Sequence, residues 1–271
     1  MTMRALLIST VSSIALATTA FAADLPNTKG PAPFLPPPPP VFSWTGIYVG
    51  ANAGGSLGTF TTSDTFGLFG TGDQYNASSR GFSGGGQIGI NYQFADNIVV
   101  GVEADFQGST LRGSYDSANI NGQAGWNDSS KVNWWGTGRA RLGYAFGNIL
   151  PYVTGGVAYG KVSTQGSCWT GSGPFSCDQS SGSVSGTHVG WTAGAGLEYA
   201  ITHNLTLKFE YLYTDLGSFN SPDHFLDASY GGPIYSPGDD MRTRTTFSTV
   251  RAGVNWKFDW LAPAGPVVAK Y

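Results

Sequence analysis

The chain of 271 residues has a formal net charge of −3, and only 11% of its residues are charged. Aromatic residues make up 14% of it and glycine occurs 40 times, a mixture that is unusual in a soluble domain of this length. The sequence contains no basic cluster, so a nucleic-acid partner is not expected.

The first 22 residues are predicted to be a secretory signal peptide. Arg4 provides a positive charge, residues 5–19 are moderately apolar, and Ala20-Phe21-Ala22 is a cleavage signal. A retained membrane helix is the alternative, but the segment is short and rich in Ser and Thr. We therefore expect an exported mature chain that begins at Ala23.

Residues 23–43 are predicted to form a Pro-rich periplasmic linker. They contain Pro31, Pro33 and the run Pro36–Pro40. Proline fixes φ and donates no backbone hydrogen bond, so this composition favours an extended polyproline spacer. A ligand of an SH3-type domain is the alternative, but such partners are not expected in this compartment.

Residues 44–258 are predicted to form an all-β fold, an eight-stranded antiparallel up-and-down transmembrane β-barrel. Eight segments alternate apolar and polar residues, as strands with two different faces do. Their connections alternate between three tight turns (95–97, 147–148, 201–204) and four long polar loops (59–81, 111–131, 163–187, 217–244). This pattern is typical of outer-membrane barrels with short periplasmic turns and long extracellular loops. The expected strands are 45–58, 82–94, 98–110, 132–146, 149–162, 188–200, 205–216 and 245–258.

The composition of the two strand faces separates this fold from a soluble lipocalin-like barrel. Beyond the leader no apolar run is long enough for a membrane helix, and only a closed barrel can otherwise satisfy every backbone group in lipid. Val100 and Val102 lie on one face of their strand, with Glu103 and Asp105 on the other. An outer surface with so few charges and so many glycines would be unusual for a soluble protein. We therefore expect the charged face to point into the lumen and the apolar face to point outward.

Nine charged residues are predicted to form a network in the lumen. Counted from the short-turn rim, Glu103 and Asp105 stand at the same heights as Arg141 and Arg139 on the neighbouring strand. An eight-stranded barrel is barely wide enough for its own side chains, and buried charges need partners. We therefore expect a packed polar plug, not a wide pore. The network comprises Glu103, Asp105, Arg139, Arg141, Glu198, Lys208, Glu210, Arg251 and Lys257.

Three segments resemble the small outer-membrane β-barrel proteins of alphaproteobacteria, often labelled "porin family" or outer-membrane surface antigens, within the OmpA-like barrel superfamily. They are 42–55 with its Trp-Thr-Gly-x-Tyr-x-Gly pattern, 151–160, and the final strand 250–258. The resemblance implies an envelope protein that contacts lipopolysaccharide and is exposed to a host or environment. The label "porin" is not itself evidence of conductance.

The final strand is also predicted to carry the signal for the barrel-assembly machinery. Gly253, Trp256 and Phe258 form its glycine and its lipid-side aromatic end. Most relatives of this class end at the terminal aromatic residue, whereas this chain continues as a tail over 259–271. Whether Phe258 or Tyr271 is recognised stays open at this stage.

Other candidate sites carry weaker signals. Cys168 and Cys177 lie in one expected loop, and an oxidising compartment favours a disulfide between them over a metal pair. His188, His203 and His224 are scattered, which indicates polar surface residues. The run Gly84-Gly85-Gly86 lacks the helix of a dinucleotide site and favours a strand bend. No catalytic residue, metal or cofactor is therefore expected.

Three functions are consistent with these features. The first is a structural envelope barrel with surface-exposed loops, the second a narrow porin for ions or small solutes, and the third an enzyme acting on outer-membrane lipid. An enzyme needs a nucleophile, a base and an orienting group within reach of one another. Because no such set can be assembled from the strand phases around His188, Ser185 and Thr187, the structural barrel is preferred.

Overall fold

The computed structural model describes residues 42–63, 74–118, 124–170, 181–222 and 240–258. The predicted leader, most of the linker and the tail lie outside these ranges. In the described part, no helix is long and apolar enough to cross a membrane. The strands are β1 (Gly46–Ser63), β2 (Gln74–Gln93), β3 (Ile98–Ser109), β4 (Arg112–Ala118), β5 (Ala124–Tyr144), β6 (Ile149–Thr170), β7 (Ser181–Ala200), β8 (Leu205–Pro222) and β9 (Asp240–Phe258).

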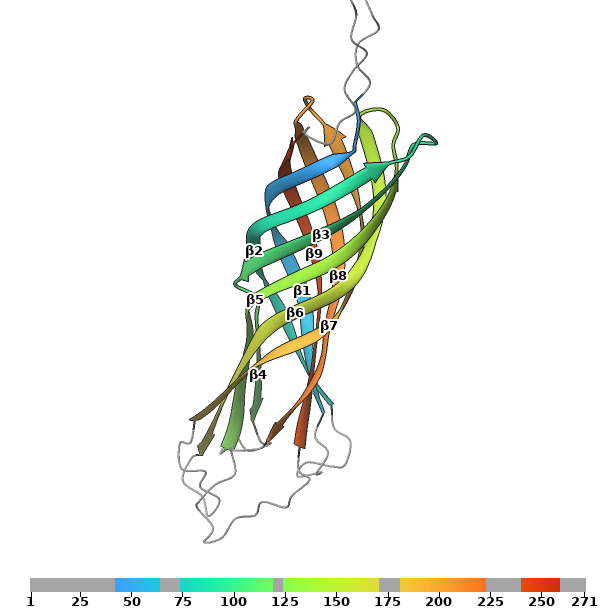
Figure 1. Ribbon diagram of the computed structural model, residues 1–271. Coiled ribbons are helices and arrows are strands. Elements are labelled where there is room, and N and C mark those ends of the chain that lie inside the picture. The colour runs from blue at the N-terminus through green and yellow to red at the C-terminus, as the bar shows by residue number, and fades with distance from the viewer. Residues whose placement is uncertain (1–41, 64–73, 119–123, 171–180, 223–239, 259–271) are drawn as a thin grey trace, which may run out of the picture. The chain divides into compact units, whose positions relative to one another are not determined.

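The strands close into an antiparallel barrel. Strands that follow one another along the chain are paired, except β3 and β4, and β1 pairs with both β2 and β9, which closes the sheet (Figure 1). β3 and β4 occupy one position in the wall, because both pair with β2 and β5. Across the break between them, Thr110 N–H donates to Phe82 O at 2.9 Å and Leu111 O accepts from Val132 N at 3.0 Å. The predicted eight-stranded barrel is therefore confirmed.

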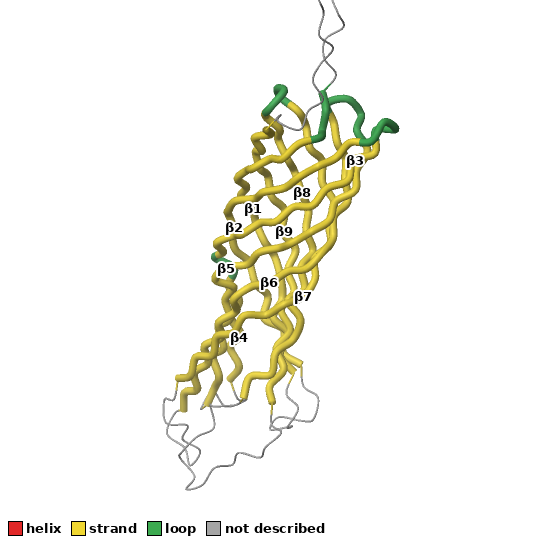
Figure 2. Tube along the Cα trace, in the orientation of Figure 1, coloured by secondary structure: helices red, strands yellow, loops and turns green. Residues whose placement is uncertain are grey.

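Three tight turns gather at one end of the barrel (Figure 2). They join β2 to β3, β5 to β6 and β7 to β8, as predicted. Asn97 and Gly147 adopt left-handed backbone conformations there, with φ of 66° and 60°. Asn and Gly tolerate this region better than other residues, which explains why they stand at these two positions.

The strands extend much further at the opposite end than the sequence indicated. The predicted loops 59–81, 111–131, 163–187 and 217–244 were too long, because most of their described residues belong to strands. A strand tilted in a membrane needs about 9–11 residues to cross, whereas β6 has 22. These outer halves are rich in Gly, Ser, Thr and Asn, so apolar alternation does not mark them. The connecting segments 64–73, 119–123, 171–180 and 223–239 lie outside the described residues.

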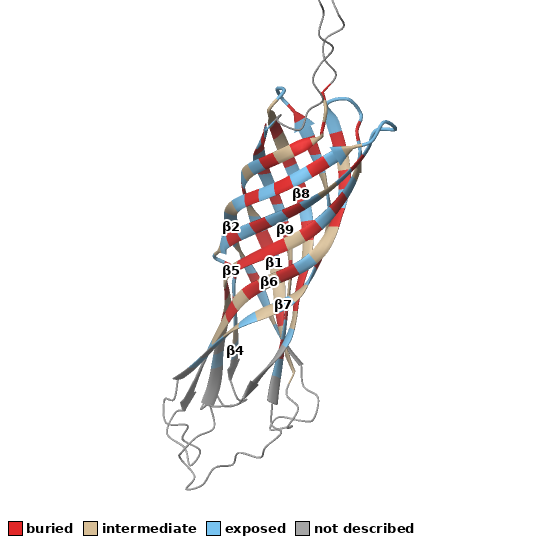
Figure 3. Ribbon diagram, viewed as in Figure 1, coloured by how far each residue is buried: buried red, intermediate tan, exposed pale blue. Residues whose placement is uncertain are grey.

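Buried and exposed positions alternate along the strands (Figure 3), and the exposed ones carry the apolar band that the sequence indicated. Val102 is 57% exposed, whereas Glu103, its neighbour on β3, is 4% exposed. The charges therefore point inward and the apolar residues outward, the reverse of a lipocalin-like barrel. Exposed apolar residues recur around the wall, among them Ile88, Phe106, Leu142, Val153, Trp191, Leu197, Phe209, Val250 and Trp256.

Two apolar layers lie inside the barrel, which the sequence reading did not anticipate. The outer layer sits in the long-strand half and comprises Phe60, Leu111, Val132, Trp135, Ala158, Val162, Leu212, Leu216 and Phe247. The inner layer sits at the short-turn end and comprises Phe42, Trp44, Val99, Ala145, Leu150 and Ala200. Along the chain, the buried Glu103 and Asp105 lie between Val99 of the inner layer and Leu111 of the outer layer.

Candidate functional site

The middle of the barrel interior holds a cluster of eight charged residues. Their inward orientation follows from strand alternation, which places positions i and i+2 on one face. All eight are buried, and they comprise four carboxylates and four cations, so the cluster has no formal net charge. The members are Glu103 and Asp105 on β3, Arg139 and Arg141 on β5, Glu198 on β7, Lys208 and Glu210 on β8, and Arg251 on β9.

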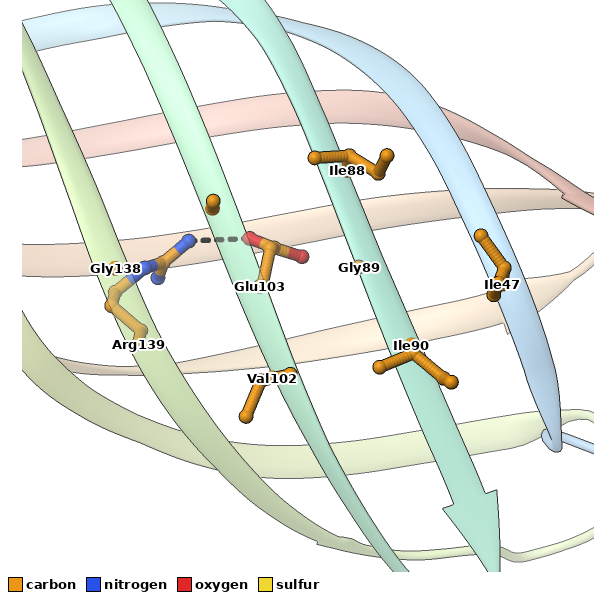
Figure 4. Close-up of a pocket in the computed structure, with 9 residues that line it drawn as sticks. Ile47, Ile88, Gly89, Ile90, Val102, Glu103, Gly138 and Arg139 are labelled. Carbon is orange, nitrogen blue, oxygen red and sulfur yellow. Dashed lines mark hydrogen bonds and ion pairs between the residues drawn. The ribbon is translucent and has the colours of Figure 1, made fainter.

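Arg139 pairs with three of the four carboxylates of this cluster. Its Nη1 donates to Glu210 Oε1 at 2.9 Å and its Nη2 to Asp105 Oδ2 at 3.0 Å. Nη2 also contacts Glu103 Oε1, the neighbour shown across β3 and β5 in Figure 4. The guanidinium therefore meets three carboxylates while its side chain is 0% exposed.

Two further cations reach across the lumen. Lys208 Nζ lies 2.8 and 2.9 Å from the two carboxylate oxygens of Glu103, although β8 and β3 are not adjacent in the wall. Arg251 Nε donates to Glu210 Oε2 at 2.7 Å and its Nη2 to Asp105 Oδ2 at 2.9 Å. These contacts cross-link opposite sides of the barrel through side chains.

Tyrosines connect Arg141 to the rest of the cluster. Arg141 donates to Glu198 Oε2 at 2.7 Å and to Tyr48 OH at 2.9 Å, and Tyr48 OH donates to Glu103 Oε2 at 2.6 Å. Tyr152 OH donates to Glu210 Oε1 at 2.9 Å while its ring lies 4.1 Å from the Arg141 guanidinium carbon.

Both tyrosine rings lie over inward-facing glycines of a neighbouring strand. A Cβ added at Gly89 would meet the Tyr48 ring, and one added at Gly196 would meet the Tyr152 ring. These two glycines therefore leave the space in which the tyrosines reach the carboxylates.

The predicted pairs are ion pairs in the structure, with Arg139 3.0 Å from Asp105 and Arg141 3.6 Å from Glu103, but the strand register differs from equal heights. Glu103 stands directly opposite Arg139, and Asp105 stands opposite Thr137, because barrel shear moves the partners by one step. Arg141 lies 3.6 Å from Glu103 but makes its shorter bond to Glu198.

Lys257 lies elsewhere, at the short-turn end. There its Nζ donates to Ser43 O at 2.5 Å and stands 4.4 Å from the centroid of the Phe42 ring. These contacts are with the segment just before β1, and the pairing of Lys257 with a carboxylate of the network stays a prediction.

Residues just before β1 cover the interior at this end. Trp44 is 2% exposed, its backbone N–H donates to Gln93 Oε1 at 2.8 Å, and its indole N–H donates to Gly147 O at 3.1 Å. Phe42 packs edge-on against Trp44, with ring centroids 4.7 Å apart. The linker was expected to end at residue 43, but Phe42 already packs into the interior of the barrel.

The outer wall carries a shallow hollow of ≈ 610 Å³ over β1, β2, β3 and β5 (Figure 4). Aliphatic side chains surround Gly89 there, and the Glu103–Arg139 pair lies behind them. Because these aliphatic side chains face outward, the hollow belongs to the apolar band. It is lined by Ile47, Ile88, Gly89, Ile90, Val102, Glu103, Ala104, Gly138 and Arg139.

The remaining candidate residues do not form a site within the described ranges. Cys168 belongs to β6, and Cys177 lies outside those ranges, so the disulfide stays a prediction. His188 is on β7 and His203 in a turn, and His224 is not described. The described residues contain no group of three or more potential metal ligands. Gly84–Gly86 lie within β2, consistent with the expected strand.

A family model described as an outer membrane protein beta-barrel domain matches residues 13–258. The chain is 40% identical over 267 residues to the 31 kDa outer-membrane immunogenic protein of Brucella melitensis biotype 1, covering 94% of this chain and 100% of that protein. The chain belongs to this outer-membrane β-barrel family. The resemblance stated from the sequence and the predicted localisation in the outer membrane are both confirmed.

The chain is also similar to a second curated outer-membrane protein and to solved barrels at lower identity. The chain is 32% identical over 222 residues to the 22 kDa outer membrane protein of Rhizobium leguminosarum bv. viciae, with 82% of each chain covered. The crystal structure of OprG from Pseudomonas aeruginosa aligns with a TM-score of 0.41 at 15% identity, covering 79% of this chain and 96% of that one.

The predicted assembly signal can be tested at the end of β9. Trp256 and Phe258 lie on the outer face, 52% and 45% exposed. A chain that ends at Phe258 is expected to assemble normally, whereas Phe258→Ala should reduce the amount of folded protein in outer-membrane fractions. Phe94→Ala is the matched control, because Phe94 is 46% exposed at the same rim. Loss of assembly on removal of 259–271, with Phe258→Ala harmless, would assign the signal to the tail.

Proposed function

We propose that this outer-membrane barrel is a structural envelope protein with a closed lumen, and that it contributes to envelope integrity and surface interactions. The observation that carries the proposal is the neutral cluster of eight buried charges that spans the interior. An open aqueous pore would solvate such charges individually, whereas here each carboxylate accepts from at least one cation on another strand.

The apolar layers at both ends support closure. Ions crossing the lumen would have to pass the outer layer around Trp135 and Phe247, the charged cluster, and the Trp44 segment in turn. Entering an apolar layer costs an ion several kcal/mol or more. The apolar layers and the paired charges together therefore favour a closed lumen over the narrow-porin alternative.

The nucleophile and base considered for the enzyme alternative lie on opposite faces of β7. Strand alternation places Ser185 and Thr187 on the exposed outer face of β7, whereas His188 points to the opposite face. A catalytic set of the kind considered from the sequence is therefore not assembled by these residues.

The partners that fit this proposal are those of an envelope barrel. We infer contact with outer-membrane lipids including lipopolysaccharide, recognition by the barrel-assembly machinery during insertion, and exposure of the long-strand end to host or environmental surface ligands. The apolar outer band supports the first, the aromatic end of β9 supports the second, and the strands extending beyond the band support the third.

Conductance tests the closed lumen directly. Full-length protein refolded into liposomes, with insertion checked by flotation, is expected to show no steady single-channel current after fusion with planar bilayers, and no efflux of a small entrapped dye. A steady open level in the wild-type protein would overturn the structural assignment and favour the porin.

A further inference from the structure

Three basic side chains from adjacent positions in the wall lie side by side on the outer surface. Arg80 of β2 stands directly opposite Arg112 of β4, and Arg112 stands directly opposite Lys131 of β5. Arg80 and Arg112 are exposed and Lys131 is half-buried. We call these three residues the basic row. Directly opposed residues of antiparallel strands have Cβ atoms about 5 Å apart, and like charges at that separation repel.

The basic row differs from the cations of the barrel interior because no carboxylate among the described side chains pairs with it. The interior cations Arg139, Arg141, Lys208 and Arg251 all have carboxylate partners, but within the described ranges no ion pair involves a residue of the basic row. The next acidic residue outward from Arg112 along its strand is Asp116, which accepts a hydrogen bond from Asn127. Since the whole chain has a formal net charge of −3, a surplus of positive charge in the sequence does not explain the row.

The basic row lies immediately beyond the apolar band, on the long-strand side. Two residues toward the membrane from Arg80 is Phe82, which is 75% exposed. On β5 the corresponding aromatic residue is Trp134, which stacks on Phe106 with ring centroids 5.5 Å apart. Exposed aromatic rings mark the level of the lipid headgroups, so the basic row stands at the headgroups of one leaflet. Lys161 follows Tyr159 on β6 in the same way and extends the positive charge to a fourth wall position.

We propose that the basic row is a binding site for the phosphate groups of an acylated glycolipid of the outer leaflet, the lipid A part of lipopolysaccharide. Arginine guanidinium groups bind phosphate oxygens in pairs, and an anion between Arg80 and Arg112 converts their repulsion into attraction. The aromatic residues just below offer a surface to the acyl chains of the same molecule. The proposal rests on the proposed envelope function for its orientation, with the long strands outside the cell.

The site is tested by binding of lipid A to the full-length protein refolded in detergent free of lipopolysaccharide. Bisphosphorylated lipid A is the ligand and the fully dephosphorylated form is the comparison. Arg80→Gln/Arg112→Gln is expected to weaken binding of the bisphosphorylated form about tenfold or more, because hydrogen bonds to charged groups are lost. Arg242→Gln removes an exposed arginine of β9 outside the basic row, and it should leave the affinity unchanged.

A stability measurement separates lost binding from misfolding. Without lipid, Arg112→Gln should unfold at the same temperature as the wild type or higher, because it relieves like-charge repulsion. Adding bisphosphorylated lipid A should then raise the unfolding temperature of the wild type more than that of the variant. Equal affinity of wild type and double variant would refute the site, as would equal binding of dephosphorylated lipid A.

Competition distinguishes the lipid from other anions. Inorganic phosphate or a sulfated polysaccharide that displaced lipid A at comparable concentration would show a general anion site and contradict the lipid assignment. A conducting lumen in planar bilayers would instead refute the closed barrel while leaving this binding result standing, so the two proposals fail separately.

Discussion

Arg139→Met is expected to lower the free energy of unfolding of the barrel by about 3–5 kcal/mol, the usual cost of removing one partner from a buried ion pair. Methionine retains most of the volume of the side chain, so the loss reports on charge. Three carboxylates, those of Glu103, Asp105 and Glu210, lose a common cation in this variant. Urea unfolding in lipid vesicles, followed by tryptophan fluorescence, measures the change.

A double-mutant cycle identifies the partner. Glu210→Gln alone should also destabilise the barrel, but the combination with Arg139→Met should cost less than the sum of the two changes, with a coupling of roughly 1–3 kcal/mol. Arg242→Ala serves as the exposed control on β9 and should change stability by no more than about 0.5 kcal/mol. Strictly additive effects of Arg139→Met and Glu210→Gln would contradict the network as drawn.

The sequence was sufficient to predict the part of the fold that lies in the membrane. Val100 and Val102 alternate with Glu103 and Asp105 because one face of β3 meets lipid and the other meets the lumen. That contrast fixes the strand phase, the number of strands and the inward direction of the charges. The tight turns were equally visible, since Asn97 and Gly147 suit the left-handed conformations found there.

The sequence did not predict the strands in the long-strand half of the barrel. Beyond the apolar band the inward-facing residues become apolar and the outward-facing residues become polar. On β1 the outward Leu57 is 69% exposed, whereas Phe60, three residues further, is buried inside. The outward positions beyond Leu57 are Thr59 and Thr61. A prediction that follows apolar residues on the lipid-facing side therefore ends the strand too early. Apolar residues at the inward-facing positions, such as Phe60, were the signal in the sequence that the strand continues.

The geometry of the charged cluster depends on information that a single strand does not carry. Glu103 contacts Lys208 across the lumen, and shear brings Arg139 opposite Glu103 in place of Arg141. Tyr48 and Tyr152 were also missed as members. Each is an aromatic residue at an inward-facing position, which the sequence alone can show. The glycines beside their rings, Gly89 and Gly196, are identified only once the strand register is known.

The outer apolar layer should contribute to stability as much as the charged cluster does. Trp135 is 1% exposed, and its ring packs edge-on against Phe247 with centroids 5.4 Å apart. Trp135→Ala is expected to destabilise the barrel by about 3–5 kcal/mol, because it removes a large buried ring and leaves a cavity. The same urea titration measures the change.

Two tryptophan variants separate packing from other effects of the indole ring. Trp191→Ala is the matched control, because Trp191 is 50% exposed on the outer wall, where surrounding lipid can fill the space that the ring leaves. Trp135→Phe should cost far less than Trp135→Ala, since the indole N–H of Trp135 has no hydrogen-bond partner among the described residues and phenylalanine keeps much of the ring. If Trp135→Ala and Trp191→Ala proved equally mild, the apolar layer would not be a packed core. The lumen would then be closed at its outer half by something other than these side chains.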